Sequence, residues 1–382
     1  MENHGRKLHN ILVTGGAGFI GCNFIHYLFG ESASGLAAFM DSGFDGRIVN
    51  VDCLTYAGNT ASLSAIDEKY GSGVSDETAR RYFFEQADIC DRPQVERIFR
   101  QYDIDTVVHF AAESHVDRSI LGPEAFVRTN VLGTFTLLDC AREFWRKPDG
   151  SMRGDVLFHH ISTDEVYGSL GETGYFTEET PYDPRSPYSA SKASSDHLAA
   201  AYFHTYGLPV TVSNCTNNYG PFQFPEKLLP LMIMNIRDGK PLPVYGDGRN
   251  VRDWIYVEDH NRGVWQIVRQ ADAGTKWNLG GENEWQNIRL LEAVIGIASE
   301  ELGLDAEKVR GQISFVKDRQ GHDRRYAIDC RKIKAALGWE RRMTFEQGLR
   351  STVRWYLLNR AWTDGILSGE YRSWIEKNYS KR

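Results

Sequence analysis

The chain has 382 residues and an ordinary globular composition, with 41% hydrophobic and 25% charged side chains. Its formal net charge of −7 argues against a nucleic-acid partner, because nucleic acids are bound by basic surfaces. No apolar run approaches the roughly 18 residues of a membrane span, and the start of the chain lacks the apolar region of a signal peptide. We therefore expect a cytoplasmic protein with no nucleic-acid and no membrane partner.

The first half of the chain alternates short β-rich runs with helical patterns. Strands are predicted at residues 10–15, 47–52, 81–88, 106–112, 155–163 and 209–216. Helical patterns lie at 124–145 and 189–207. This alternation favours right-handed βαβ crossovers, and the nearly continuous apolar strands indicate a sheet covered on both faces. The predicted fold class is α/β, with a Rossmann-type doubly wound parallel sheet.

After about residue 217 the alternation stops and Pro and Gly become frequent. Separate helices are predicted at 288–303 and 344–362. We expect a Rossmann domain over 1–217 and a smaller mixed C-terminal lobe over 218–382, with segments near 251–270 as candidates to return to the first domain. The Gly- and Ser-rich stretches 30–46 and 70–80 are interpreted as loop insertions.

The six cysteines form neither a CxxC pair nor a cluster with His at metal-ligand spacing. Several lie in apolar runs, which favours free buried thiols in a reducing compartment. No metal site is predicted. The six positions are Cys22, Cys53, Cys90, Cys140, Cys215 and Cys330.

The segment TGGAGFIG places Gly15, Gly18 and Gly21 between the first strand and an amphipathic helix. Glycines there permit a tight turn and a close approach of the backbone to a pyrophosphate, and the helix N-terminus supplies amide donors. The alternative is a glycine-rich turn without a ligand. The position in the first βα unit favours a dinucleotide site.

Asp52, at the end of the second strand, suits the ribose hydroxyls of NAD and would repel the extra phosphate of NADP. It follows Gly21 by 31 residues, more than the usual separation of about 20, and the 30–46 insertion accounts for the excess. A plain strand-end cap remains the alternative. Asp88, after the third strand, has the same two interpretations, either a contact on the adenine side or a cap.

The segment YSASK places Tyr188 and Lys192 four residues apart, on one face of a helix. A tyrosine with a reference pKa of about 10 needs help to act as a base, and a nearby ammonium and a positive nicotinamide ring would both favour the phenolate. Such a tyrosine takes a hydroxyl proton while hydride leaves the same carbon. Taken alone, the pair is also compatible with an ordinary helix surface.

The segment STDEVYG places two carboxylates, Asp164 and Glu165, directly after a buried strand. They could cap a helix or a turn, or they could be an acid and a base held over a substrate. A pair of carboxyl groups can divide these two roles if their surroundings push the two pKa values apart.

These motifs, with HFAAESHVDRS (109–119), resemble the extended short-chain dehydrogenase/reductase superfamily, whose members act on nucleotide sugars. STDEVYG is similar to the nucleoside-diphosphate-glucose 4,6-dehydratases, and the similarity continues through 214–231, 243–260 and 321–329. It covers most of the chain except the two insertions and the last 40 or so residues. Thr216 and Gln320 depart from the usual pattern of that group.

The resemblance implies an NAD-dependent lyase in which hydride passes from sugar C4 to NAD⁺, water is lost across C5 and C6, and the hydride returns to C6. The implied substrate is dTDP-glucose. UDP-glucose, or another epimerase or dehydratase reaction on a nucleotide sugar, is the alternative. It further implies that Asp164 is the acid, that Glu165 is the base, and that Thr163 hydrogen-bonds the C4 oxygen beside Tyr188. A non-catalytic, dinucleotide-bound protein would be expected to lack some of these groups.

The resemblance also implies the binding residues. Cofactor contacts are expected at Gly15, Gly18, Phe19, Ile20, Gly21, Asp52, Leu54, Thr55, Asp88, Ile89, Ala111, Ala112, Ser114, Thr129, Tyr188, Lys192 and Asn218. Substrate contacts are expected at Ser114, Thr163, Asn217, Lys227, Leu228, Pro243, Tyr245, Arg252, Asn287, Arg319 and His322. Lys227, Arg252 and Arg319 suit a pyrophosphate, although each could be a solvated surface charge. His322 and Glu113 have structural roles as alternatives.

A homodimer is the last implication of the resemblance. The helices at 124–145 and 188–207 would pair across a two-fold axis as a four-helix bundle. The apolar residues expected there are Phe126, Val131, Phe135, Leu138, Leu198, Ala201 and Tyr202. The alternative is that both helices only cover the sheet.

Overall fold

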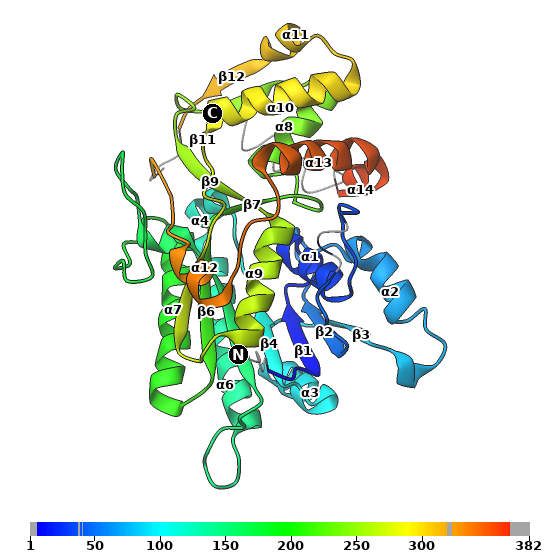
Figure 1. Ribbon diagram of the computed structural model, residues 1–382, viewed down its shortest axis with the longest axis vertical. Coiled ribbons are helices and arrows are strands. Elements are labelled where there is room, and N and C mark those ends of the chain that lie inside the picture. The colour runs from blue at the N-terminus through cyan, green and yellow to red at the C-terminus, as the bar shows by residue number, and fades with distance from the viewer. Residues whose placement is uncertain (1–5, 37–38, 40, 319–322, 367–382) are drawn as a thin grey trace.

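A seven-stranded parallel sheet forms the centre of the protein in the computed structural model, which describes residues 6–36, 39, 41–318 and 323–366 (Figure 1). Its strand order is β10-β6-β5-β4-β1-β2-β3. The strands are β1 Asn10–Thr14, β2 Arg47–Asp52, β3 Tyr82–Gln86, β4 Thr106–His109, β5 Leu157–Thr163, β6 Val210–Cys215 and β10 Thr275–Leu279. The six predicted strands and the Rossmann-type fold class are confirmed, and most strands are shorter than predicted.

Helices cover both faces of this sheet, as a doubly wound fold requires. α3, α6 and α7 pack side by side on one face, and α1 and α9 pack against each other on the other face. Helices of the Rossmann part are α1 Phe19–Leu28, α2 Ser64–Tyr70, α3 Arg92–Tyr102, α4 Val116–Leu121, α5 Pro123–Phe126, α6 Thr134–Trp145, α7 Pro187–Tyr206 and α9 Val257–Gln270. A π-helical segment, Val127–Gly133, joins α5 to α6. Short 3-10 helices occupy Thr60–Leu63, Glu77–Ala79 and Asp164–Tyr167.

The remaining elements form a smaller lobe at the carboxyl end of the sheet strands (Figure 1). It contains two small sheets, with strand orders β11-β9-β7 and β12-β8. The strands are β7 Asn217–Tyr219, β8 Leu242–Tyr245, β9 Val251–Tyr256, β11 Glu284–Gln286 and β12 Ile313–Val316. The helices of the lobe are α8 Leu228–Arg237, α10 Asn287–Leu302, α11 Ala306–Arg310, α13 Phe345–Leu358 and α14 Arg360–Ile366. The helix α12 Arg331–Leu337 lies beside β10 and α9 at the main sheet (Figure 1).

The chain crosses between the two parts more than once. β10 pairs in parallel with β6 along the register Thr275–Leu279 to Thr211–Cys215, so the main sheet is completed by residues far beyond position 217. Buried apolar side chains run without a break from the α1 and α9 face of the sheet into α8, α10 and α13. The lobe is therefore packed onto the sheet through a shared core.

Local sequence signals set the ends of the longest helix. α7 begins with a capping box in which Ser186 and Ser189 bond to each other's backbone, followed by Pro187 in the first turn. It ends at Gly207, whose φ of 67° suits a glycine cap. The predicted helix 344–362 differs, because it ends at Leu358 and a new helix begins at Arg360. The Asn359 side chain and backbone N–H both donate to the Trp355 carbonyl, and Asn359 leaves the helical conformation with a φ of −97° and a ψ of 51°.

The exposed fractions of side chains correct two expectations from the sequence, one about the cysteines and one about the dimer interface. All six cysteines are free, but only four are buried, since Cys53 is exposed and Cys90 is half-buried. Of the residues expected at a dimer interface, Phe126 and Leu138 are 1% and 0% exposed and belong to the interior of the protein. Phe135, three residues before Leu138 on the same helix, is 38% exposed, so only Leu138 of the two is fully buried.

Candidate active site

The glycine turn after β1 forms one end of a long cavity of about 390 Å³, called here the long cavity. Gly15 has a φ of 69°, and a Cβ there would lie 2.6 Å from the Ala111 backbone. At Gly21 a Cβ would lie 2.4 Å from the Gly15 carbonyl oxygen, so only glycine lets α1 start this close to the turn. The first amides of α1 therefore face a cradle without side chains, which fits a dinucleotide pyrophosphate.

Asp52 lies at the end of β2 and is 9% exposed. Its Oδ2 accepts the Ala17 N–H at 3.0 Å and its Oδ1 accepts the Leu54 N–H at 2.9 Å. Burial raises the pKa of this carboxyl. Asp52 is thus a cap for the glycine turn and also lines the long cavity, where each oxygen keeps a lone pair for a ribose hydroxyl. Leu54 acts through its backbone and lies outside the lining.

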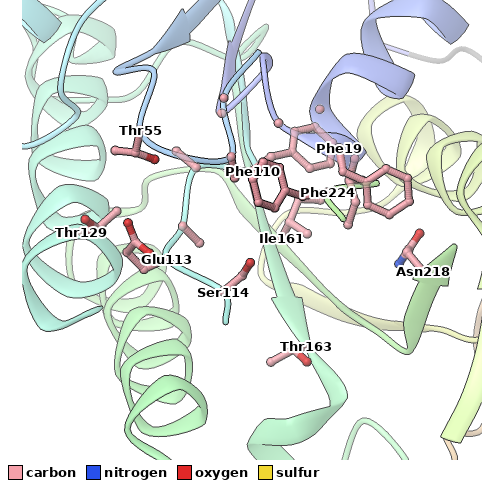
Figure 2. Close-up of a pocket in the computed structure, with 18 of the residues that line it drawn as sticks. Phe19, Thr55, Phe110, Glu113, Ser114, Thr129, Ile161, Thr163, Asn218 and Phe224 are labelled. Atoms are coloured by element: carbon pink, nitrogen blue, oxygen red, sulfur yellow. The ribbon is translucent and has the colours of Figure 1, made fainter. Parts of the chain in front are cut away.

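Another part of the cavity wall comes from the loops that follow β3 and β4 and from the π-helical segment. Asp88 accepts the Cys90 N–H at 2.8 Å and lies 3.6 Å from Arg128, so it caps a turn while lining the cavity. Figure 2 shows the side chains of Thr55, Ser114 and Thr129 around this space. Other expected cofactor residues in the lining are Gly15, Gly18, Phe19, Ile20, Gly21, Ile89, Ala111, Ala112, Tyr188, Lys192 and Asn218.

The acidic pair lies where β5 ends and a 3-10 helix begins (Figure 2 shows Thr163 at this strand end). Thr163 is the cap, because its Oγ1 accepts the Glu165 N–H at 3.3 Å. Asp164 is 1% exposed, and among the described residues its Oδ2 has no hydrogen-bond partner. Burial, together with the charges of Glu165 and Asp253, raises the pKa of Asp164 well above its ordinary value. Asp164 is therefore suited to hold a proton at neutral pH.

Tyr188 and Lys192 reach the same end of the cavity from α7. Burial raises the pKa of Tyr188 well above its ordinary value, and the charge of Glu165 raises it further. The sequence had suggested a phenolate favoured by a nearby ammonium. In the protein, however, the Lys192 Nζ donates to the Ile161 carbonyl at 2.8 Å, and burial lowers the lysine pKa to about 8. Burial and the charge of Glu165 therefore favour the phenol form of Tyr188, so acceptance of a proton by this residue depends on the positive nicotinamide ring of a bound cofactor.

A second cavity of about 180 Å³, called here the adjoining cavity, continues from this end into the lobe. It shares Ser114, Glu165, Asn217 and Lys227 with the long cavity, so Glu165 stands at the junction. The expected substrate residues in its lining are Ser114, Asn217, Lys227, Leu228, Pro243, Tyr245, Arg252 and Asn287. Thr163 lines only the long cavity. Arg319 and His322 lie outside the described residues.

The two described cations of this cavity are held in different ways. Arg252 is 7% exposed, donates to the Asp323 carbonyl at 3.0 Å and lies 4.2 Å over the Tyr326 ring. Lys227 donates to the Ser114 carbonyl at 3.1 Å. Arg252 is thus a fixed and buried charge, which suits recognition of an anionic group.

Sequence reasoning gave no role to three residues that stand between the two cavities. The Arg118 guanidinium lies 3.7 Å over the Tyr56 ring, and its Nε is 3.2 Å from Glu226 Oε2. Tyr56 lines the long cavity and Glu226 lines both. The only available signal was their position inside or beside segments already matched by resemblance, because the contacts join parts of the chain 108 residues apart.

Across the part of the chain that the structure describes, no group of three His, Cys, Asp or Glu side chains could hold a metal ion. No described helix is long and apolar enough to span a membrane.

The fold and site together define a Rossmann-fold enzyme of the short-chain dehydrogenase/reductase type. The family model for GDP-mannose 4,6 dehydratase matches residues 12–352. The chain is 50% identical over 381 residues to dTDP-glucose 4,6-dehydratase 1 of Escherichia coli K12, covering 97% of this chain and 99% of the relative. It is 50% identical over 372 residues to dTDP-glucose 4,6-dehydratase of Neisseria meningitidis, covering 96% and 98%.

Solved structures show the same likeness. DesIV, a dTDP-glucose 4,6-dehydratase from Streptomyces venezuelae with NAD and TYD bound, superposes with a TM-score of 0.80 at 43% identity, covering 94% of this chain and 99% of that one. UDP-glucose 4-epimerase from Thermotoga maritima with UDP-glucose gives 0.75 at 27% identity, covering 92% and 99%. The chain belongs to the nucleotide-sugar 4,6-dehydratase family described by the GDP-mannose 4,6 dehydratase model.

Proposed function

We propose that this protein is a hydro-lyase that converts dTDP-glucose to dTDP-4-keto-6-deoxyglucose with NAD as its cofactor. The observation that carries the proposal is the pair of buried Asp164 and half-buried Glu165 at the end of the long cavity, beside Tyr188. An epimerase needs only the oxidation and return of hydride, whereas elimination of water needs an additional acid and base. The relatives of about 50% identity that are called dTDP-glucose 4,6-dehydratase support the substrate.

NAD, when bound, accepts hydride from sugar C4 and later returns it to C6. The glycine turn and the α1 amides bind the pyrophosphate, and Asp52 accepts hydrogen bonds from the ribose. Tyr188 takes the proton of the C4 hydroxyl, and Thr163 holds the C4 oxygen. The ketone at C4 makes the C5 proton acidic. Glu165 removes that proton, and Asp164 protonates the C6 hydroxyl so that it leaves as water.

The adjoining cavity would hold the nucleotide part of the substrate. Arg252 and Lys227 are the described cations available for the two phosphates, and Pro243 and Tyr245 lie where a base would pack. Arg319 and His322 remain predicted phosphate contacts. Thymine and uracil differ by one methyl group, which is worth about 1–3 kcal/mol in a fitted pocket, so UDP-glucose is the alternative substrate.

The test is to incubate the purified protein with dTDP-glucose, UDP-glucose and GDP-mannose and to assay each mixture for a 4-keto-6-deoxy product. We expect turnover of dTDP-glucose without added NADH or oxidant, because the hydride returns. A C4 epimer as the only product, or NADH accumulating in step with product, would contradict the proposal.

We also infer a cytoplasmic homodimer. Its support is an exposed apolar surface on the outer side of the segment 127–135 and at the end of α7. The residues are Val127 at 57% exposure, Leu132 at 45%, Phe135 at 38% and Tyr206 at 48%. The inner sides of α6 and α7 cover the sheet, so these helices have two apolar sides.

A further inference from the structure

Glu226 is a buried carboxylate beside the place where two phosphates of a nucleotide sugar would bind. It is 5% exposed and lines both cavities. It also precedes Lys227, one of the described cations available for those phosphates. Burial raises the pKa of Glu226, and the charges of Lys227 and Arg118 act against that rise. A carboxylate next to phosphates is unfavourable unless a positive charge compensates it.

Arg118 supplies a compensating charge from behind the cavity walls. Its Nε donates to Glu226 Oε2 at 3.2 Å, and its guanidinium lies 3.7 Å over the Tyr56 ring. Arg118 belongs to α4, Glu226 to the segment before α8, and Tyr56 to the loop after β2. Among the described residues that line the two cavities, Arg118 is absent. Any effect of Arg118 on a bound nucleotide must therefore pass through Glu226 or Tyr56.

Other charged groups surround Glu226. His115 of α4 places its Nε2 4.0 Å from the same Oε2 that Arg118 contacts. Glu113, in the loop after β4, is a second carboxylate whose pKa is raised by burial and held back by the charges of Arg118 and Lys227. The two carboxylates are thus matched by two cations, and loss of Arg118 leaves one negative charge uncompensated. The remaining titratable groups at this end of the cavities are Tyr56, Asp117 and Glu165.

We propose, on the basis of the proposed function, that Arg118 is a positioning residue that keeps Glu226 ionised and compensated while the nucleotide pyrophosphate occupies the adjoining cavity. With Arg118 present, the nucleotide enters a site whose charges already balance, and no proton has to move. Without Arg118, the phosphates approach an uncompensated carboxylate. One proton from solvent is then taken up by the pair of Glu226 and His115, which lie too close to titrate independently.

The alternative is that Arg118 only ties the loop after β2 to the lobe through its contacts with Tyr56 and Glu226. A structural tie predicts that its loss weakens nucleotide binding equally at every pH. The proposed role predicts a loss that depends on pH, because Glu226 can give up its charge by taking a proton. Burial already raises the pKa of Glu226, and removal of Arg118 and arrival of phosphates both raise it further. Affinity should therefore fall as the pH rises through that pKa.

The experiment is a titration of the NAD-loaded protein with dTDP, which has no hexose and is not turned over. Calorimetry between about pH 7 and pH 9, in two buffers with different heats of ionisation, gives the dissociation constant and the number of protons taken up. The variants are Arg118→Met, Arg118→Lys and the double variant Arg118→Met with Glu226→Gln. The matched control is Arg97→Met, which breaks a pair outside both linings, Arg97 Nη2 to Glu85 Oε2 at 2.7 Å.

In Arg118→Met we expect dTDP to bind at least about tenfold more weakly at the alkaline end, because like charges then face each other. The dissociation constant should rise by up to about tenfold per pH unit, with uptake of up to about one proton more per chain than in the wild type. The double variant should regain affinity and lose the additional proton uptake. Arg97→Met should match the wild type in both measurements.

Arg118→Lys tests whether the charge alone is enough. The present contact is made by Nε, which is nearer the backbone than a lysine Nζ, so the ammonium of Arg118→Lys can reach Glu226. This variant should bind dTDP as the wild type does, without additional proton uptake. If Arg118→Lys behaves as Arg118→Met does, the compensating charge is not what matters, and the proposal is overturned.

Weaker binding of Arg118→Met at every pH alike, with no additional proton uptake and no recovery in the double variant, would assign Arg118 a structural role and overturn the proposal. Unchanged affinity across the pH range would overturn it as well. If Arg118→Met fails to fold, Tyr56→Leu removes the stacked ring and leaves both charges, and weakened binding at every pH there would also overturn the proposal.

Failure of the wild-type protein to bind dTDP is a different result, because it rejects the proposed nucleotide site itself. Product formation from dTDP-glucose would then be absent as well. A defect confined to Arg118→Met leaves product formation by the wild type intact, so the two failures can be told apart.

Discussion

Asp164 and Glu165 are neighbours in the sequence but occupy different surroundings. Asp164 is 1% exposed, whereas Glu165 is half-buried at the junction of the two cavities. Each ionised carboxylate disfavours ionisation of the other, and burial decides which of them keeps the proton. This asymmetry is what an acid and a base acting on adjacent carbons require.

Tyr188 with Lys192 is assigned to the oxidation at C4, and Asp164 with Glu165 to the elimination of water. These separate roles can be tested by measuring the absorbance of bound NADH in a single turnover. Asp164→Asn keeps the shape but cannot protonate the leaving hydroxyl, so it should oxidise C4 and then stall with NADH present. Tyr188→Phe should slow the first hydride transfer and show little NADH. Each of the two substitutions should reduce the rate of product formation by about 10²–10⁴-fold. Equal absence of NADH in both variants, with substrate bound, would contradict separate roles.

The pH dependence of the same signal follows from the raised pKa of Asp164. Because the pKa is raised, the acid form persists at neutral pH and is lost as the pH rises through that pKa. Elimination should then slow while oxidation continues, so the steady-state fraction of enzyme holding NADH should increase toward alkaline pH. In Asp164→Asn this fraction should be high and lack that increase. A wild-type fraction that falls with rising pH would contradict the assignment of Asp164 as the acid.

At the scale of single elements, the strands and the site residues at their ends were the features that the sequence predicted best. Buried parallel strands are continuous apolar runs, and a functional residue at a strand end has a fixed place relative to its neighbours. Asp52 and Thr163 could be placed for this reason. The contacts of Arg118 with Tyr56 and Glu226 depend on how α4 packs, which periodicity alone does not specify.

The ends of helices and the direction in which they pack are also not specified by the periodicity of the sequence. The pattern over 344–362 is apolar enough for one helix, but α13 ends at Leu358, because Asn359 has a non-helical backbone. Apolar residues of the segment 124–145 differ in burial, since Leu138 joins the core while Phe135 is 38% exposed. A helix with two apolar sides gives no sequence signal for which of them faces the sheet.

The sheet and α9 also contain histidines that are neutral in the folded protein. Burial lowers the pKa of His260 from an ordinary 6.5 to about 4, so the unfolded chain binds the additional proton between these values. Stability is therefore fully present above about pH 6.5 and is lost as the pH falls toward 4, by up to about 1.4 kcal/mol per pH unit for this residue.

His260→Gln should reduce the pH slope of the unfolding free energy between about pH 5 and pH 6 by roughly that amount. The slope is measured by urea unfolding at a series of pH values. His9→Gln removes an exposed histidine and serves as the comparison variant. An unchanged slope in His260→Gln would mean that this histidine is protonated in the folded protein.

At the scale of the whole molecule, the proposed homodimer depends on the surface formed by Val127, Leu132, Phe135 and Tyr206. Phe135→Glu places a charge at this surface on both subunits and should weaken association by about 2 kcal/mol or more, as at other interface hot spots. Light scattering should then report a mass near the 43.4 kDa of one chain.

The matched control is Phe315→Glu on β12, where a phenylalanine is 62% exposed outside this surface. It should leave the mass at twice that of one chain. A wild-type protein that is already monomeric at micromolar concentration would count against the dimer.

The late return of β10 to the main sheet has a consequence for synthesis on the ribosome. β6 ends at Cys215 and β10 begins at Thr275, so the outer edge of β6 lacks its partner while 60 residues are added. At about 5–20 residues per second this interval lasts roughly 3–12 seconds. A strand edge with open amides and carbonyls can pair with other nascent chains during that time. Slow codons between positions 216 and 274 should therefore increase the fraction of chains lost to aggregation, and a chaperone that covers β6 should reduce it.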